Sequence, residues 1–237
     1  MSKTQAYKPS DSRVSHLEHV LSTLQYHKAL RAFDFVIKEM SNDKGFTRSD
    51  GTHYYYHLID VTQILINFGI REESIIVSAL LHDAVEDIDW VTPDYIEGVY
   101  GSDVRDIVMR VTKKQGVDYK TDTDEMNRYL EQIESRYESA LVKTADRIHN
   151  FSTMSTMSQK HRMKQVTETR EMYIPFFKRC RKRYVRHSEF FYFAKTTIEP
   201  VLSEIESSDR KIKALEGQFR LLRDGVYGVS PQAESKF

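Results

Sequence analysis

The sequence predicts an all-α protein, a helical bundle that is followed by a helical extension at the C-terminus. Its long segments repeat apolar residues at intervals of three and four, the spacing that places them on one face of a helix. Only nine glycines and five prolines occur in 237 residues, which disfavours a turn-rich β architecture. Because 40% of the residues are hydrophobic, the chain can bury one sizeable core.

Helical segments follow one another along the chain. The first spans residues 17–40 and is followed by a loop with the sequence SNDKGFTRSDG. The second spans about 56–68, and Gly69 ends it. Thr92 and Pro93 then mark a helix start, as N-cap and first helical residue. The remaining helices are expected at 72–87, 103–113, 124–147, 159–180, 185–207 and 209–223.

The pattern divides the chain into three parts. Residues 1–16 are expected to form a flexible arm. Residues 17–180 contain most of the apolar helices and are expected to fold as the main domain. Residues 181–237 are expected to form the helical C-terminal extension.

Charge and cysteine content exclude several classes of protein. Thirty-five basic and 35 acidic residues give a formal net charge of zero, so no global field points to nucleic acid or to a basic partner. The single cysteine, Cys180, excludes an intramolecular disulfide and fits a reducing cytoplasm. No stretch approaches ~18 consecutive apolar residues, and the N-terminus has no apolar signal core. We therefore expect a cytoplasmic protein without a membrane span.

In the stretch SALLHDAVEDIDW, residues 78–90, the titratable residues His82, Asp83, Glu86 and Asp87 interrupt an otherwise apolar helix. Residues four apart share a helix face, so His82 lies over Glu86 and Asp83 lies over Asp87. An unpaired buried charge is strongly unfavourable. The stretch is therefore either an acidic face in contact with solvent or the wall of a site that binds a cation.

Two further apolar segments contain metal-ligand residues, His57 in THYYYHLIDVTQIL and Asp146 in ALVKTADRIHNFSTM. Together with His82 and Asp83 they offer two imidazoles and two carboxylates, which different helices of a bundle can bring together. That set suits manganese, iron or zinc, and spacing does not choose among them. Each residue alone is more often structural. Their order, with every member in an apolar helix, favours a metal site.

The order and context of these residues resemble the HD-domain phosphohydrolase superfamily. The closer resemblance is to the hydrolase half of RelA/SpoT-type enzymes and to the small alarmone hydrolases, over roughly residues 30–180. It implies an all-helical HD-domain fold, one bound Mn²⁺ and a role in the stringent response. The implied reaction removes the 3′-pyrophosphate from the guanosine alarmones ppGpp and pppGpp and yields GDP or GTP. The segments that carry the resemblance are RSDGTHYYYH, ALLHDAVED, YGSDVRDIVMRVTK, VKTADRIHN and TREMYIP.

The resemblance also implies roles for individual residues. The metal ligands would be His57, His82, Asp83 and Asp146. The acidic pair that positions and activates the attacking water would be Glu86 and Asp87. The residues that face the nucleotide, the first of them contacting its base, would be Arg48, Asn150 and Thr153. The two remaining histidines of these segments are expected to support the ligands or to pack, namely His53 and His149.

Several positions depart from the family pattern. Ser49 stands where a basic residue is common, and Asp50 stands where a serine is typical. Both lie in the expected substrate loop. Leu58 replaces a proline after the first ligand, and Phe151-Ser152 replaces a Met-Arg or Leu-Arg pair. The departures in the loop bear on the substrate, while the metal set is intact.

Other functions therefore stay open. The nearest alternative is the same chemistry on another 3′-phosphorylated nucleotide, on NADPH or on an RNA 3′ end. A second is a regulator that binds a nucleotide without cleaving it, which would have no need of two acids beside a metal. A third is a different HD activity, a 5′-nucleotidase or a cyclic phosphodiesterase.

The segment KRCRKRYVRH, residues 178–187, contains six lysines or arginines and no acid. Such a short basic run is more often a helix end in contact with solvent. The alternative is that it supplies the positive charge missing at Ser49, or that it recruits an RNA end. The charged helices that follow could cover the site or mediate self-association.

Overall fold

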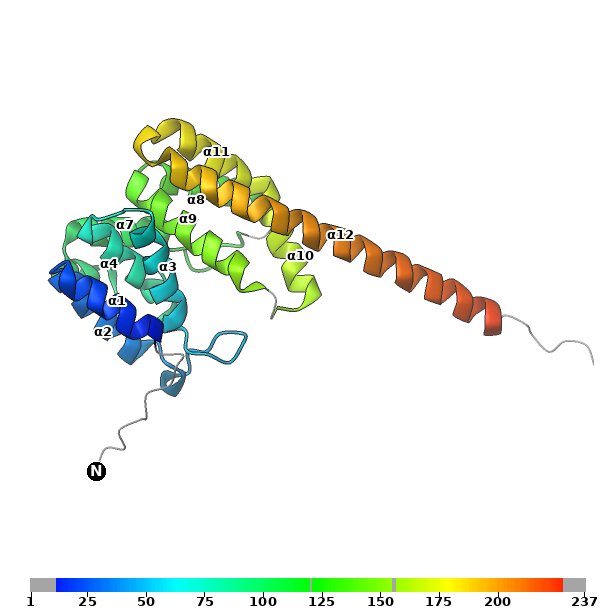
Figure 1. Cartoon of the computed structure of the whole chain (residues 1–237), viewed down its shortest axis with the longest axis horizontal. Helices are drawn as coiled ribbons and strands as arrows, with labels where there is room; N and C mark the ends of the chain where they lie inside the picture. The colour runs from blue at the N-terminus through cyan, green and yellow to red at the C-terminus, as the bar shows by residue number, and fades with distance from the viewer. Residues whose placement is uncertain (1–11, 120, 155–156, 228–237) are drawn as a thin grey trace, which may run out of the picture.

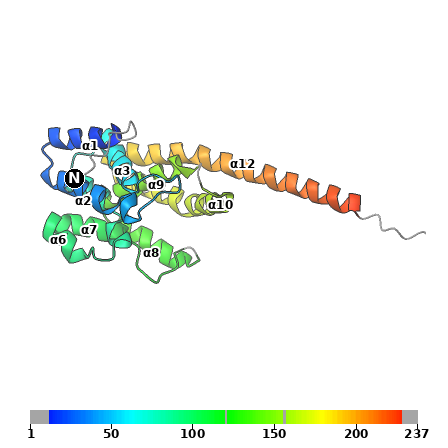
Figure 2. The same cartoon turned by 90° about the horizontal axis from the view of Figure 1, so that it is seen from below.

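The computed structural model describes residues 12–119, 121–154 and 157–227, which form a helical bundle with a long C-terminal helix (Figures 1 and 2). The predicted all-α class is confirmed, because β pairing in these ranges is limited to one antiparallel bridge between Thr47 and His53. In chain order the helices are α1 (Ser12–Thr23), α2 (His27–Glu39), η2 (Asn42–Lys44), α3 (Tyr55–Asn67), α4 (Glu73–Leu81), α5 (Ala84–Asp87), α6 (Pro93–Tyr100), α7 (Ser102–Val111), α8 (Thr123–Glu134), α9 (Tyr137–Ser152), α10 (Gln159–Glu168), η4 (Thr169–Tyr173), α11 (Ile174–Arg183), η5 (Val185–His187) and α12 (Ser188–Tyr227).

Helix α9 lies at the centre of the bundle. It contacts α3, α4, α7, α8 and α12, and therefore most of its side chains are buried from Ser139 onward. Its buried Arg147 holds the next helix in place. The guanidinium lies 3.6 Å from the centre of the Tyr173 ring, and it donates to Gln165 at 2.5 Å and to Glu168 at 3.0 Å. Helix α10 and the π-helical turn η4 are thus fixed on α9.

Several predicted helices are divided in the structure. The segment 17–40 forms α1 and α2, because Gln25 takes a positive φ of 57° between them. The segment 124–147 divides into α8 and α9 at Ser135 and Arg136. The segment 159–180 divides into α10, η4 and α11. In each case the apolar spacing continues across the break, which is why the sequence pattern does not reveal it.

At the C-terminus the opposite error occurs, since the helices predicted at 185–207 and 209–223 are one helix of 40 residues, α12. Asp209 could have capped a new helix. Its carboxylate instead accepts a hydrogen bond from Gln159 on α10 at 2.9 Å and pairs with Lys213 one turn further on at 2.8 Å. Despite its length, neither α12 nor any other helix in the described ranges is apolar enough to cross a membrane.

The predicted limits of the main domain differ from those of the packed bundle. Helix α1 begins at Ser12, so the last residues of the predicted arm are helical, while residues 1–11 lie outside the described part of the chain. At the other limit, the predicted boundary after Cys180 falls inside α11. The first half of α12 packs on α9 and α11, where Phe191 and Leu202 are completely buried. Half of the predicted extension therefore belongs to the core.

Leu202→Ala should lower the free energy of unfolding by ~2–5 kcal/mol, because it removes a fully buried side chain and leaves a cavity between α12 and the bundle. Leu221, on the same helix, is 75% exposed, and Leu221→Ala should change the free energy of unfolding by no more than ~0.5 kcal/mol. Urea denaturation of both variants measures the difference. Equal effects would show that the first half of α12 is not part of the core.

Candidate metal centre

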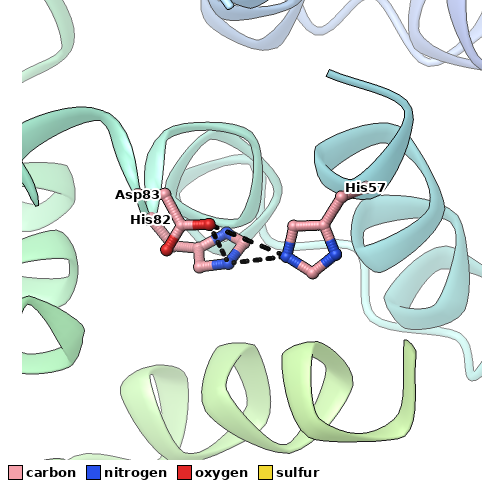
Figure 3. Close-up of side chains that lie close together, drawn as sticks. All are labelled: His57, His82 and Asp83. Atoms are coloured by element: carbon pink, nitrogen blue, oxygen red, sulfur yellow. Dashed lines mark hydrogen bonds and ion pairs between the residues drawn. The ribbon is translucent and has the colours of Figure 1, made fainter. Parts of the chain in front are cut away.

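Three helical segments bring two histidines and two aspartates together in the bundle. His57 comes from α3, His82 and Asp83 follow α4, and Asp146 comes from α9. The two imidazole Nε2 atoms lie 3.3 Å apart. Asp83 Oδ2 lies 3.2 Å from Nε2 of His82, and Asp146 Oδ1 lies 3.3 Å from Nε2 of His57. Figure 3 shows the two rings and the Asp83 carboxylate pointing toward one another.

The predicted position of His82 and Asp83 in the middle of one helix is corrected by the structure. Helix α4 ends at Leu81 and α5 begins at Ala84, so the pair forms a short junction between two helices. Asp83 has φ −99° and ψ −5°, slightly outside regular helix geometry. The junction turns its carboxylate toward the histidines.

The donor set fits a divalent cation. Ligand atoms that share an ion at ~2.1 Å lie about 3 Å apart, close to the 3.2 to 3.7 Å that separate the two imidazole nitrogens from each other and from the carboxylate oxygens of Asp83 and Asp146. One ligand atom from each of His57, His82 and Asp83 lies within 4.8 Å of the other two. Two imidazole nitrogens and carboxylate oxygens are ligands for several first-row divalent metals. The residues that the sequence predicts as ligands are thus brought together in the structure.

Electrostatics favour a positive charge between these groups. Burial lowers the pKa of His57 to about 4. Burial opposes a charge on His82 as well, but the Asp83 and Asp146 carboxylates outweigh it and raise the pKa of His82 to about 9. Although burial also opposes the charge of Asp146, the ammonium group of Lys143 and the two histidines hold the pKa of its carboxyl well below its usual range.

The second nitrogen of each histidine is also held. Nδ1 of His82 lies 2.8 Å from the carbonyl oxygen of Ala79, to which it donates, so Nε2 is left with its lone pair. Nδ1 of His57 lies 2.7 Å from Nδ1 of His149, and Nε2 of His149 lies 3.2 Å from Oδ2 of Asp60. If His149 donates to Asp60, its Nδ1 accepts from His57, whose Nε2 then has a lone pair for a metal.

Arg13 completes this chain of contacts, with Nη1 2.6 Å from Oδ2 of Asp60. The predicted supporting role of His149 is consistent with its contact to His57. His53 has a different environment, because its Nδ1 accepts from the backbone N–H of Asn42 at 3.0 Å and its ring stacks on Tyr55. It holds the loop that precedes α3.

The aspartates are held by residues that sequence reasoning did not assign. The Tyr54 hydroxyl donates to Oδ2 of Asp83 at 2.7 Å. The Lys143 ammonium group pairs with Oδ2 of Asp146 at 2.9 Å. Helical spacing could have indicated the second contact, since Lys143 precedes Asp146 by three residues, whereas the contact of Tyr54 joins two segments that are 29 residues apart. The side chain of Asn150, predicted to face the nucleotide, donates to Oδ1 of Asp146 at 2.6 Å.

The acidic pair lies beside the metal centre and faces a cleft. The backbone N–H of Lys113 donates to Oε1 of Glu86 at 2.5 Å, which fixes that carboxylate. Burial raises the pKa of Glu86 above its usual value. Burial, followed by the negative charges of Asp83 and Glu86, raises the pKa of Asp87 to about 6.

The cleft has a volume of about 830 Å³, and Glu86 and Asp87 form part of its wall together with residues of α7 and α8 and the segment between them. Its basic lining residues are Lys113, Lys114 and Arg128. The ammonium groups of Lys113 and Lys143 both lie within 6 Å of the centre of the Tyr129 ring, at 5.8 and 5.9 Å. Positive charge is thus concentrated next to the acidic pair.

The loop before α3 brings two further predicted residues together. Nη2 of Arg48 donates to Oγ1 of Thr153 at 3.0 Å, and its guanidinium lies 5.8 Å from the centre of the Tyr54 ring. Asp50 accepts from the backbone N–H and the hydroxyl of Thr52, at 3.0 and 2.6 Å. These hydrogen bonds lower the pKa of Asp50, so the loop carries a negative charge beside Arg48.

The basic run at 178–187 lies at the other end of α9. Arg179 pairs with Glu134 at 2.7 Å, the guanidinium of Arg181 lies 4.4 Å from the centre of the Tyr192 ring, and His187 stacks on Tyr137, the first residue of α9. These contacts join α11 and η5 to neighbouring helices. An RNA-binding role of the run stays a prediction.

Residues 32–180 match the protein family described as HD domain. The match covers more than half of the chain, so the protein belongs to the HD-domain family.

Named relatives show which members of the HD-domain family the chain is similar to. A guanosine-3′,5′-bis(diphosphate) 3′-pyrophosphohydrolase of Aquifex aeolicus is 34% identical over 164 residues, 67% of this chain and 23% of that protein. A GTP pyrophosphokinase Rsh of Brucella ovis is 28% identical over 149 residues, 61% of this chain and 19% of that protein. The solved structure of a metazoan ortholog of SpoT, described as hydrolysing ppGpp, covers 86% of this chain and 98% of its own, with 24% identity and a TM-score of 0.46. The predicted resemblance to RelA/SpoT-type proteins is confirmed by the two bacterial sequences, of whose length the chain spans about a fifth.

Asp60→Asn should weaken the binding of a divalent metal by about 10- to 100-fold, because the carboxylate that orients His149, and through it His57, loses its charge. Isothermal titration of metal-free protein with Mn²⁺ measures the affinity. Asp146→Ala, which removes a proposed ligand, should abolish binding. The exposed Glu131 on α8 provides the control, and affinities that agree for wild type, Glu131→Gln and Asp60→Asn would contradict the supporting role.

Proposed function

We propose that this protein is a metal-dependent hydrolase that removes the 3′-pyrophosphate of guanosine alarmones, converting ppGpp and pppGpp to GDP and GTP. The observation that carries the proposal is the acidic pair Glu86–Asp87, which follows the ligand residues His82 and Asp83 and lines a cleft that also contains Lys113 and Lys114. A structural metal site or a simple binder would have no need of such a pair. The HD-domain match and the activity named for the Aquifex relative support the same reaction.

The cation is proposed to be Mn²⁺, held by His57, His82, Asp83 and Asp146. The resemblance to RelA/SpoT-type hydrolases implies this metal, and the carboxylate ligands suit it. When bound, a divalent cation of this kind polarises a phosphoryl oxygen and lowers the pKa of a water molecule. The protein's part is to hold the four ligands at the right separations and in the right tautomers, through the contacts of Ala79, His149, Tyr54 and Lys143.

Glu86 and Asp87 are proposed to have different roles toward the attacking water. Glu86 is fixed by the backbone N–H of Lys113 and would accept a hydrogen bond from the attacking water, which orients it. Asp87 has a pKa of about 6, close to the value that suits a general base at neutral pH, and would take the proton of that water. The water oxygen attacks the phosphorus next to the ribose 3′-oxygen. The bond between this phosphorus and the ribose 3′-oxygen breaks, the 3′-oxygen takes up a proton, and pyrophosphate leaves.

The substrate is proposed to lie across the metal centre. Arg48 and Thr153, joined by a hydrogen bond, would contact the nucleoside on one side. Asn150 would stay with Asp146, with its remaining polar atoms available to the ribose. The pyrophosphate would extend into the cleft, toward Lys113, where positive charge compensates its negative charge.

The substrate loop favours a second candidate within the same chemistry. The ionised Asp50 beside Arg48 and the absence of a base at Ser49 reduce the positive charge available to a heavily phosphorylated nucleotide. A substrate that places less negative charge at this loop, such as a nucleotide with a 3′-monophosphate, NADPH or the terminal nucleotide of an RNA 3′ end, fits it as well.

A screen of nucleotides with 3′-phosphates and 3′-pyrophosphates, with and without Mn²⁺, tests the function. We expect release of pyrophosphate from ppGpp, dependent on Mn²⁺. The variant Glu86→Gln with Asp87→Asn should keep the fold and the metal but lose about 10²-fold or more of the turnover number, because it removes the general base. Turnover by this variant within a few-fold of wild type would refute the assigned role. Hydrolysis of NADPH or an RNA end in preference to ppGpp would select the second candidate.

Lys113→Met should raise the KM for ppGpp and the inhibition constant of inorganic pyrophosphate by about tenfold or more, because a charge-assisted hydrogen bond to phosphate is lost. The backbone N–H that holds Glu86 remains in this variant. Lys178→Met, in the basic run, is the control and should change neither constant. Steady-state kinetics with pyrophosphate as inhibitor gives both. The opposite pattern, with Lys178→Met affected and Lys113→Met unaffected, would move the phosphate contact to the basic run.

A further inference from the structure

The short segment that follows α7 is held by side chains on both sides of Lys113, where α7 and α8 lie next to each other (Figure 2). Before it, the carbonyl oxygen of Val111, the last residue of α7, accepts a hydrogen bond from the hydroxyl of Tyr129 on α8. After it, the backbone N–H of Lys114 donates to the hydroxyl of Tyr119 at 3.0 Å. A backbone group at the end of a helix needs a partner outside that helix, and here the two hydroxyls supply it.

The same two tyrosines flank the ammonium group of Lys113. Its nitrogen lies 5.6 Å from the centre of the Tyr119 ring and 5.8 Å from the centre of the Tyr129 ring, within the range of cation–π attraction. The two ring centres are 5.3 Å apart, so they form a nearly equilateral triangle with the ammonium nitrogen. All three side chains line the cleft beside the acidic pair.

This arrangement leaves the ammonium group able to bind an anion. An aromatic ring attracts a cation through its face but does not neutralise it as a carboxylate does. None of the acids that line the cleft in the described part of the chain pairs with this ammonium group. Glu125 pairs with Arg128, and Glu86 accepts from the backbone N–H of Lys113. The charge of Lys113 is thus held in place and remains available to a phosphate group.

We propose that Tyr119 and Tyr129 are positioning residues, which hold Lys113 so that its backbone N–H orients Glu86 and its ammonium group binds the departing pyrophosphate. The inference rests on the proposed function, because it assigns the two contacts of Lys113 to the attacking water and to the leaving group. The hydroxyls of the tyrosines support the first contact and their rings support the second. Variants that keep one of these groups and remove the other therefore separate the two effects.

The ring contact is tested by the affinity for inorganic pyrophosphate, which does not depend on turnover. Equilibrium dialysis with a trace of radiolabelled pyrophosphate, at a fixed free concentration of Mn²⁺, gives the dissociation constant. Tyr119→Leu should raise this constant about two- to fivefold, and Tyr119→Phe, which keeps the ring, should recover most of the affinity. In the Lys113→Met background Tyr119→Leu should have no effect, because the charge that the ring holds is absent.

Tyr192→Leu is the matched control, because it removes a ring that also contacts a cation, the guanidinium of Arg181 at 4.4 Å, but lies outside the cleft. It should leave the dissociation constant unchanged. An unchanged constant in Tyr119→Leu would overturn the ring contact. Equal effects of Tyr119→Leu with and without the Lys113 side chain, or equal effects of Tyr119→Leu and Tyr119→Phe, would do so too.

Tyr129→Phe tests the backbone contact, since it removes the hydroxyl that holds Val111 and keeps the buried ring. Amide hydrogen exchange of Lys113, measured by NMR, should become about threefold faster or more, because the hydrogen bond of that N–H to Glu86 opens more often. The turnover number for ppGpp should fall by a similar factor. Unchanged exchange, or faster exchange with unchanged turnover, would overturn the backbone role. A wild type that does not hydrolyse ppGpp would refute the proposed function, while dialysis and exchange would still decide the role of the tyrosines.

Discussion

The Nε2 atoms of His57 and His82 lie 3.3 Å apart in the interior of a helical bundle, and the charges of the surrounding groups must make this contact favourable. With both rings neutral, their lone pairs would face each other, and burial prevents both from taking a proton. A single positive charge between them, shared with two carboxylates, removes the conflict. The carboxylates raise the pKa of His82 to about 9, so a proton occupies that place when no metal does. The same electrostatic demand is met better by a divalent cation.

The surrounding residues balance the charges that this arrangement requires. Lys143 compensates Asp146 from inside the bundle, and Arg13 compensates Asp60 from its edge. Glu86 and Asp87 line the cleft next to this centre, and their pKa values are raised first by burial and then by the neighbouring negative charges. Four titratable residues in an apolar stretch are tolerated for this reason, because their charges face compensating groups and a cleft rather than hydrocarbon.

The all-α fold was predicted from the sequence. His57, His82, Asp83 and Asp146 were also indicated as metal ligands, because hydrophilic residues are unusual in apolar helices. The finer features depend on contacts between distant segments, which periodicity does not carry. The backbone N–H of Lys113 reaches Glu86 only because α7 packs against α4. Helix α12 continues through Asp209, whose carboxylate accepts a hydrogen bond from Gln159 on α10 and does not cap a new helix.

Local geometry was missed for a related reason. The junction at His82 and Asp83 contains no glycine or proline, and so the sequence gives no sign that the helix is interrupted there. No role was assigned to Tyr54 from the sequence, because aromatic residues at helical spacing usually fill a core. Its hydroxyl contact with Asp83 depends on how α3 and α4 meet.

The separation of the ligand groups along the chain has a consequence for folding. The ligand set extends from residue 57 to residue 146, and the contact between His57 and His82 alone spans 25 residues. A bound ion would therefore act as a reversible cross-link that closes long loops. Disulfides have this role in secreted proteins, but a chain with a single cysteine cannot form one within itself. Because an ion binds only where all three segments are already assembled, it binds the folded state and stabilises it by mass action. The resistance of the bundle to unfolding is then set partly by the free concentration of the metal.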